Sequence, residues 1–309
     1  MKTLAELLAE FLAHKRALLH SWQTLRQSGF INRSFLRWLQ ATHGVVTPDR
    51  LRSVHLASWQ RHLLGWRTTK GLPLKAVTVN VRLRYARSWL RWLGKRGAVP
   101  ARLLESLEYL HTTKLLPQSV LDHAQMRKML SAIDTSNAQG VRDRAMLEML
   151  YTSGIRAREL VGLNLAAVSI EQATAVVLGK GGKERVVPIG KTALRWLESY
   201  LKGVRPFVVR DPAQPALWLS RLGQRLGYEP LRLMVRRYAA QAGLPATVTA
   251  HTFRRSCTTE LVKSGGNPWH IKELLGHANL DTLQHYARLT IVDLKKTHAK
   301  CHPRERENG

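Results

Sequence analysis

The sequence predicts a mainly α-helical fold with a small β-sheet, divided into an all-helical N-terminal half and a mixed α/β C-terminal half. In the first 110 residues, apolar side chains recur at helical spacing and indicate helices alone. Further along, two β-rich runs flank a glycine-rich turn between segments of helical pattern. The length of 309 residues suits about two domains.

Four helices are predicted in the N-terminal half. Leucines and a phenylalanine at helical spacing mark the first. Thr47 followed by Pro48 is a cap with proline at the first helical position, which predicts that the third helix begins there. The fourth has the clearest apolar stripe and ends at a glycine- and proline-containing segment. The predicted ranges are 4–12, 30–39, about 48–65 and 76–93.

Arginines give the helix at 76–93 a second, basic face. Arg84, Arg87 and Arg91 lie at positions i, i+3 and i+7, apart from the apolar stripe that contains Leu83. Such a face is either an ordinary solvated surface or a row of contacts to phosphates. The positive charge of the whole chain favours DNA-phosphate contacts.

A segment with few core positions separates the two halves. Residues 111–118 are predicted to form a linker around the run Lys114–Pro117. Asp122 and Gln125 then match a capping box, which opens a new helix. The predicted domains therefore cover residues 1–110 and 119–309.

The C-terminal half combines helices with one predicted β-hairpin. Its strands are the β-rich runs 175–178 and 185–189, joined by the glycine-rich turn 179–184. Asn267 before Pro268 is a second cap-plus-proline helix start. The predicted helices cover residues 143–150, 191–202, 229–242, 252–264, 268–275, 281–287 and 290–298.

Charge is the strongest compositional signal. The chain has 49 lysines and arginines against 21 acidic residues, a formal net charge of +28 that is spread along its length. This excess carries a cost in self-repulsion and usually indicates a polyanionic partner, most often nucleic acid. An anionic membrane surface is the weaker alternative, because no predicted helix pairs a lysine-rich face with a lipid-like face.

Other classes of protein fit the sequence poorly. No stretch approaches the roughly 18 apolar residues of a membrane span, and the N-terminal residues lack the pattern of a secretion signal. Cys257 and Cys301 are the only cysteines and do not have the spacing of a metal site. We therefore expect a cytoplasmic protein in a reducing compartment, with no membrane partner.

The glycine-rich turn is a poor match to a phosphate-binding P-loop. Its spacing is wrong, no serine or threonine follows the lysine, and a strand follows where a helix should begin. The better interpretation is a hairpin tip that presents Lys180 to a groove. Lys183 and Arg185, beside it, are candidate DNA contacts.

Basic residues precede a tyrosine near the end of the chain. His251 and Arg254 lie three residues apart at a predicted helix start and share a face. His277 follows a Leu-Leu-Gly turn, and Tyr286 comes nine residues later. A phenol is a poor nucleophile unless a base takes its proton and cations neutralise the charge that develops on its target. Each residue alone also fits an ordinary structural role, so the functional argument rests on their combination and order.

A metal site is the rival interpretation of the two histidines. No aspartate, glutamate or cysteine at ligand spacing completes a ligand set, and arginine does not bind metals. No metal is therefore expected.

The ordered motifs resemble those of the tyrosine recombinase, or phage integrase, family, specifically its Xer-like branch. The resemblance is close from about residue 119 to the end and looser over the helical half. It implies a core-binding (SAM-like) domain followed by a tyrosine-recombinase catalytic domain. The motifs are YTSGIRAREL at 151–160, GKGGKER at 179–185, HTFR at 251–254, LLGH at 274–277, and Tyr286.

The resemblance implies a covalent mechanism. Tyr286 would be the nucleophile that forms a 3′-phosphotyrosyl link to DNA. Arg156 and Arg254 would hold the non-bridging oxygens of the phosphate, a task that suits the planar fork of arginine better than lysine. Phosphoryl transfer of this kind depends mostly on positioning and charge neutralisation.

The remaining implied roles concern protons. Lys180 would protonate the leaving 5′-hydroxyl, His251 would assist as acid or base, and His277 would hydrogen-bond the phosphate. Because the covalent link conserves the energy of the broken bond, no ATP, metal or other cofactor is expected.

As a whole, the resemblance implies a nucleoid-associated, site-specific recombinase whose two domains enclose duplex DNA. Four protomers would assemble on two sites and exchange strands through a Holliday junction, in integration, excision or dimer resolution. An accessory protein or a partner recombinase is compatible with this scheme. Two alternatives stay open: a type IB topoisomerase-like enzyme that relaxes DNA, and a non-catalytic DNA-binding protein on the same scaffold.

Overall fold

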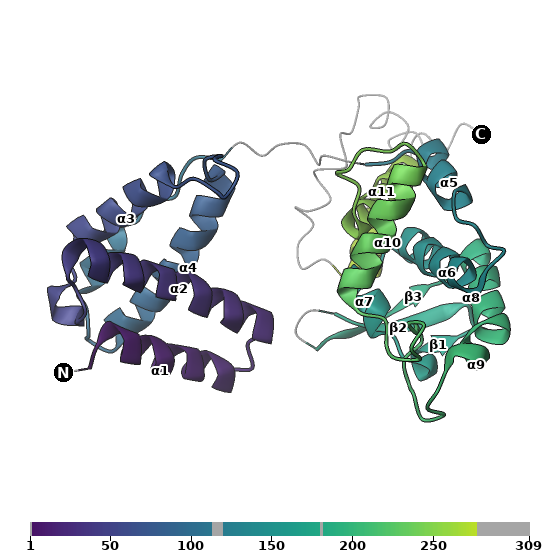
Figure 1. Cartoon of the computed structure of the whole chain (residues 1–309), viewed down its shortest axis with the longest axis horizontal. Helices are drawn as coiled ribbons and strands as arrows, with labels where there is room; N and C mark the ends of the chain where they lie inside the picture. Colours follow the sequence, from purple (N-terminus) through teal and green to yellow (C-terminus); the bar gives the residue numbers. More distant parts are fainter. Residues whose placement is uncertain (1, 113–119, 180–181, 277–309) are drawn as a thin grey trace, which may run out of the picture. The chain divides into compact units, whose positions relative to one another are not determined.

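The computed structural model describes residues 2–112, 120–179 and 182–276 of the 309-residue chain. The chain divides into two compact units, Met1–Lys114 and Leu115–Gly309, which are described separately (Figure 1). The structure confirms the predicted fold class, mainly helical with one small sheet. Most of the predicted linker, and both helices predicted beyond residue 280, lie outside the described residues.

The named secondary-structure elements in the described part of the first unit are all helices (Figure 1). Its core is rich in large aromatic side chains, and Phe35, Trp59 and Trp89 are completely buried. The Phe35 ring packs against both tryptophans, at centroid distances of 5.3 Å and 6.4 Å. The elements are α1 (Leu4–Ala17), α2 (Trp22–His43), the 3₁₀ turn η1 (Pro48–Arg50), α3 (Ser53–Gly65), α4 (Ala76–Lys95) and the 3₁₀ segment η2 (Ala101–Ser106).

The prediction that a continuous helix begins at Pro48 was wrong. Residues 48–50 form one 3₁₀ turn, and α3 begins only at Ser53. Thr47 provides no side-chain cap for the turn. Leu51, which follows the turn, has an extended backbone and a buried side chain. Arg52 is also extended, and its N–H donates to the His55 ring nitrogen Nδ1 at 3.1 Å. Burial of Leu51 therefore outweighs the local helix-start signal.

The second unit surrounds helix α6 (Figure 1). Most α6 side chains are buried, including Met146, Leu147, Met149 and Leu150, so this helix lacks the polar face of a surface helix. The helices are α5 (His123–Ser131), α6 (Ala138–Ser153), α7 (Ala157–Gly162), η3 (Leu165–Ala167), α8 (Lys191–Gly203), α9 (Arg205–Val208), α10 (Tyr228–Gln241), α11 (Ala250–Lys263) and α12 (Pro268–Leu275).

The sheet of the second unit contains the predicted hairpin and one additional strand. Strands β1 (Val168–Ser169), β2 (Thr174–Leu178) and β3 (Glu184–Pro188) are antiparallel in the order β1-β2-β3. Val176 pairs with Val186, and alternate side chains face the core as the two-residue period of a strand requires. Strand β1 was not predicted, because two residues are too few to show that period.

Several predicted caps are present. The Asp122–Gln125 capping box opens α5, and Asn267 accepts the N–H of Trp269 at the start of α12. Asn137 caps α6 by accepting the N–H of Gly140, so α6 begins earlier than predicted. Within the described ranges, no helix is long and apolar enough to cross a membrane.

Candidate active site

Three arginines converge on the C-terminal end of α12. The consecutive carbonyls of residues 274–276 accept, in that order, from Arg185 Nε at 2.9 Å, Arg254 Nη2 at 2.6 Å and Arg156 Nη2 at 3.0 Å. Carbonyls at a helix end lack intrahelical partners and lie at the negative end of the helix dipole, so cations are stabilised there. We call Arg156, Arg185 and Arg254 the arginine clasp.

Glycine at position 276 allows this convergence. Gly276 adopts the left-handed conformation with φ +60°, which ends α12. A Cβ at this position would lie 3.1 Å from Cδ and 3.2 Å from Nε of Arg185. The absence of a side chain therefore leaves room for Arg185 to reach the end of the helix.

Glu159 on α7 binds two members of the clasp. Its Oε1 accepts from Arg156 Nη1 at 2.6 Å and from Arg185 Nη1 at 3.0 Å. Its Oε2 accepts from the Arg156 backbone N–H and from Arg185 Nη2, both at 2.8 Å. Burial alone would raise the pKa of Glu159, but hydrogen bonds from Arg185 and Arg156 outweigh it and lower the pKa. Glu159 is therefore held as a carboxylate.

Arg254 joins the ends of two helices. It projects from α11, is 3% exposed, and donates from Nη1 to the carbonyl of Gly154 at 2.7 Å as well as from Nη2 to α12. Gly154 is the left-handed cap that ends α6. Burial, and then the nearby charge of Arg156, lower the pKa of Arg254 to about 10. The guanidinium therefore stays charged at neutral pH.

His251 lies three residues before Arg254, in the first turn of α11. The residue is exposed at the surface. Partial burial of its ring, followed by the charges of Arg255, Arg254 and Arg156, lowers the pKa of His251. A neutral imidazole at pH 7 can take up a proton, as the proposed acid/base role requires.

The base of the β2–β3 hairpin adjoins the clasp. The Gly179 N–H donates to the carbonyl of Lys183 at 2.7 Å, and a Cβ on Gly179 would lie 3.5 Å from Arg185 Nη1 and 3.9 Å from Glu159 Oε1. Lys183 is exposed. Lys180, which follows Gly179 in sequence, lies outside the described residues.

The two C-terminal members of the predicted set also lie outside the described residues. These are His277 and Tyr286. His277 directly follows Gly276 in sequence, and the carbonyl of Gly276 is bound by the clasp. Among the described residues, the structure brings together Arg156, Arg254 and His251 from the predicted catalytic set.

Arg185 differs from the other predicted DNA contacts. Its side chain is only 11% exposed, and all three of its guanidinium nitrogens donate to Glu159 or the end of α12. The sequence interpretation assigned no role to Glu159. Its position three residues after Arg156 at a helix start was the available signal, because an i, i+3 pair shares a helix face.

The predicted basic face on α4 belongs to the first unit. Arg84 and Arg91 are exposed there. Arg87 is half-buried, with its guanidinium 5.6 Å from the ring centroid of Tyr109. Two of the three predicted arginines therefore present their side chains freely to solvent.

The clasp has an excess of positive charge. The clasp contains three guanidiniums, and two of them, those of Arg156 and Arg185, pair with the buried carboxylate of Glu159. An electropositive cluster of this kind suits an oxyanion with several oxygens, such as a phosphate. Across the described ranges, no group of three or more histidine, cysteine, aspartate or glutamate side chains could hold a metal ion.

Comparison with known proteins identifies the family. Residues 119–291 match the model of the phage integrase family, which is more than half of the chain. The chain belongs to this family. A tyrosine recombinase XerC 2 of Ralstonia nicotianae is 32% identical over 94% of this chain and 84% of the relative. A tyrosine recombinase XerD of Listeria monocytogenes is 30% identical over 98% of this chain and 100% of the relative.

These relatives place the chain in the Xer-like branch of the tyrosine recombinases. Enzymes of this family cleave and rejoin DNA strands in site-specific recombination. The fold is also similar to that of a solved integrase. The Tn1549 transposon integrase, solved in complex with a circular intermediate DNA, superposes with a TM-score of 0.76 over 97% of this chain and 99% of that structure, at 18% identity.

Proposed function

We propose that this tyrosine recombinase cuts duplex DNA when the Tyr286 oxygen attacks a backbone phosphorus held by Arg156 and Arg254. The new bond is a 3′-phosphotyrosyl link, and the bond from phosphorus to the 5′-oxygen breaks. The phenol gives up its proton, with His251 as the acid/base group, and the leaving 5′-hydroxyl receives a proton from Lys180. His277 would hydrogen-bond the phosphate.

The arginine clasp is the observation that carries this proposal. A guanidinium has five N–H donors. In the part of the chain that the structure describes, Arg254 uses two of them and the Arg156 guanidinium uses two. The others remain to bind the oxygens of a phosphate. Loss of one such donor typically costs about 10²-fold in rate.

Arg185 has a different role in this scheme. Its donors point to Glu159 and to the carbonyl of Leu274, so we assign it to positioning Arg156 and the start of the segment that carries His277. Arg84 and Arg91 on α4, together with Lys183 on the hairpin, are the exposed cations that would contact the DNA backbone.

The assembly in this proposal is a tetramer on two synapsed duplex sites, with strand exchange through a Holliday junction. The comparison structures include an XerH recombinase bound to its difH substrate before cleavage. The net charge of +28 supports a DNA partner, because phosphate contacts dominate the affinity of proteins for DNA.

Covalent trapping tests the nucleophile. The full-length enzyme would be incubated with a library of DNA fragments and denatured, and the adducts isolated. Nuclease digestion and mass spectrometry would then locate the nucleotide-bearing peptide, and sequencing of the bound ends would give the target site. We expect the nucleotide on Tyr286, no adduct with Tyr286→Phe, and normal adducts with the control Tyr228→Phe. Adducts of undiminished yield from Tyr286→Phe would disprove the assignment.

A plasmid assay separates recombination from relaxation alone. Plasmids carrying two copies of the recovered site should yield recombinant products. A supercoiled plasmid without the site should stay supercoiled. Efficient relaxation of that second plasmid, without recombinants from the first, would instead indicate a type IB topoisomerase-like activity.

A further inference from the structure

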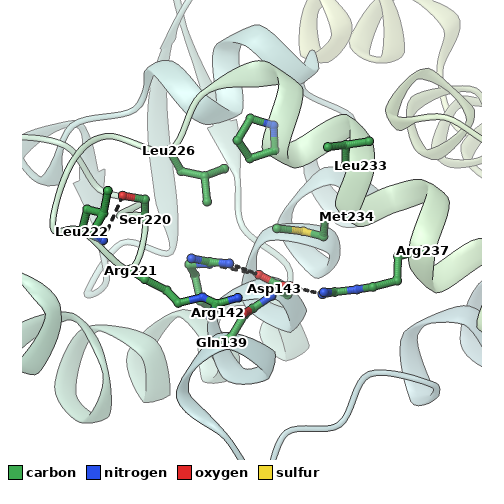
Figure 2. Close-up of a pocket in the computed structure, with 11 residues that line it drawn as sticks. Gln139, Arg142, Asp143, Ser220, Arg221, Leu222, Leu226, Leu233, Met234 and Arg237 are labelled. Carbon is green, nitrogen blue, oxygen red and sulfur yellow. Dashed lines mark hydrogen bonds and ion pairs between the residues drawn. The ribbon is translucent and has the colours of Figure 1, made fainter.

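A cavity of about 490 Å³ lies between the N-terminal end of α6, the turn at residues 220–224 and the first half of α10. Figure 2 shows the side chains that line it. We call it the α6–α10 pocket. It lies at the opposite end of α6 from Gly154, which contacts the arginine clasp. Asp143 and Gly154 are eleven positions apart in sequence, which corresponds to about 16 Å along a helix.

The charge of the pocket is positive. Arg142, Arg221 and Arg237 line it, and Asp143 is the one acidic side chain among the described residues of the lining. The Asp143 carboxylate is completely buried and accepts from Arg142 Nη2 at 2.6 Å and from Arg237 Nη2 at 2.9 Å (Figure 2). It also accepts from the Tyr238 hydroxyl at 2.9 Å. Arg142 Nε donates a fourth hydrogen bond at 3.0 Å, so each oxygen of this carboxylate already accepts two hydrogen bonds from the protein.

Two of the arginines retain donors for a ligand. Arg237 uses only its Nη2 group in this network, and its side chain is 46% exposed. Arg221 is exposed and makes no hydrogen bond or ion pair with any residue in the described ranges. The pocket therefore presents guanidinium groups that an incoming carboxylate could bind in a charge-assisted, bidentate manner.

The rest of the lining is apolar. Leu226 and Met234 form its buried part, while Leu222 and Leu233 are 63% and 57% exposed. Such leucines gain from a partner that covers them, because removing apolar surface from water favours association. A ligand that fits must therefore combine an acidic group with an apolar side chain.

The turn that carries Arg221 and Leu222 is held in place. The N–H of Ser220 donates to the carbonyl of Gln224 at 2.7 Å, and Gly223 adopts φ +72°. A Cβ on Gly223 would lie 2.8 Å from the carbonyl oxygen of Val208, so only glycine fits here. An ordered rim reduces the entropy that a ligand must lose on binding.

We propose that the α6–α10 pocket binds a short segment of a partner protein in which acidic and apolar residues alternate. Charge complementarity identifies this occupant. The chain's own residues 290–309 fit poorly, because they contain five lysines and arginines against three acidic residues. A DNA backbone fits poorly as well, because it offers nothing to cover the leucines.

A peptide-binding measurement tests this proposal. The probe is a fluorescein-labelled pool of octapeptides with Glu or Asp at alternate positions and Leu, Ile or Phe between them. Its anisotropy is measured with the full-length protein at near-physiological salt. We expect saturable binding that falls about tenfold in Leu222→Ser and at least tenfold in Arg221→Glu. Both residues are exposed, so both variants should fold.

Matched variants separate this pocket from general attraction to a basic protein. Arg195→Glu changes charge at an exposed position on α8, and Phe207→Ser removes an exposed apolar side chain. Both should bind the pool like the wild type. Equal weakening by Arg195→Glu and Arg221→Glu would overturn the proposal. A second combination of results would also overturn the proposal: peptide binding that is unchanged in Leu222→Ser, together with weaker binding of a DNA duplex in Arg221→Glu. The pocket would then contact DNA phosphates and not a peptide.

Discussion

Replacement of Glu159 by glutamine should destabilise the second unit and slow DNA cleavage. The carboxylate accepts four hydrogen bonds, two at each oxygen. Glutamine keeps one oxygen and places an amide NH₂ against donors at the other position, so two charge-assisted bonds are lost and Arg185 stays buried without its counter-charge. Each such bond contributes about 1.5–3 kcal/mol, so we expect a loss of about 4 kcal/mol. For a unit of this size, that lowers Tm by about 8–16 °C.

The pH dependence of unfolding provides the sharper assay. Because the pKa of Glu159 is lower in the folded protein, the wild type has this stabilisation above the ordinary carboxyl range and loses it as pH falls below about 4.5. The Tm difference between wild type and Glu159→Gln, followed by calorimetry, should therefore be largest at neutral pH and shrink in acid.

A matched variant and a rate measurement complete this test. Glu171→Gln, at an exposed position in the same unit, should melt like the wild type. The yield of covalent DNA adduct from Glu159→Gln should fall at temperatures where the variant is still folded, because Arg156 loses its anchor. A Glu159→Gln variant with wild-type Tm and wild-type adduct yield would refute the role given to this carboxylate.

Three further predictions concern the same region. Arg254→Lys keeps the charge but reaches only one of the two carbonyls, so adduct formation should fall about 10²-fold; a fall of less than threefold would count against phosphate binding by this fork. His251 has a lowered pKa and should act in its neutral form, so the cleavage rate should decline only below about pH 6.5, and His251→Gln should flatten that decline. A wild-type rate that instead fell as pH rose would contradict this. Gly154→Ala combines a φ of +60° with a Cβ 2.8 Å from Leu275 Cδ2, so its unfolding free energy should fall by about 2–3 kcal/mol. Gly44→Ala, with φ +63° and open space, isolates the backbone strain and should cost about 1 kcal/mol; equal losses would show that the close contact is unimportant.

Local patterns in the sequence predict most of the helices. The apolar stripe of α4 is buried at Val79, Leu83, Leu90 and Leu93, because a period near 3.6 specifies which face meets the core. The hairpin was predictable from its two β-rich runs and the glycines between them. Strand β1, which has two residues and exists only through its pairing with β2, has no such local signal.

The candidate site was predictable in its residues but less so in their contacts. The spacing of His251 and Arg254 places both at the start of one helix, as the structure shows. No sequence pattern predicts that Arg185 turns inward to Glu159, because that contact joins a strand to a helix 26 residues away in the chain. Long-range ion pairs of this kind depend on the packed fold and not on local periodicity.

The hydrogen bonds from the arginine clasp to the carbonyls of residues 274–276 have a consequence for how the phosphate and the nucleophile are aligned. The backbone atoms that the clasp holds lead directly into the segment with His277 and Tyr286. In the proposed reaction, other N–H groups of the same Arg156 and Arg254 guanidiniums hold the phosphate. A small displacement of these arginines then moves the target and the origin of the nucleophile-bearing segment together. The phosphate and the start of that segment then shift in the same direction, so the distance between them changes less than the position of either one.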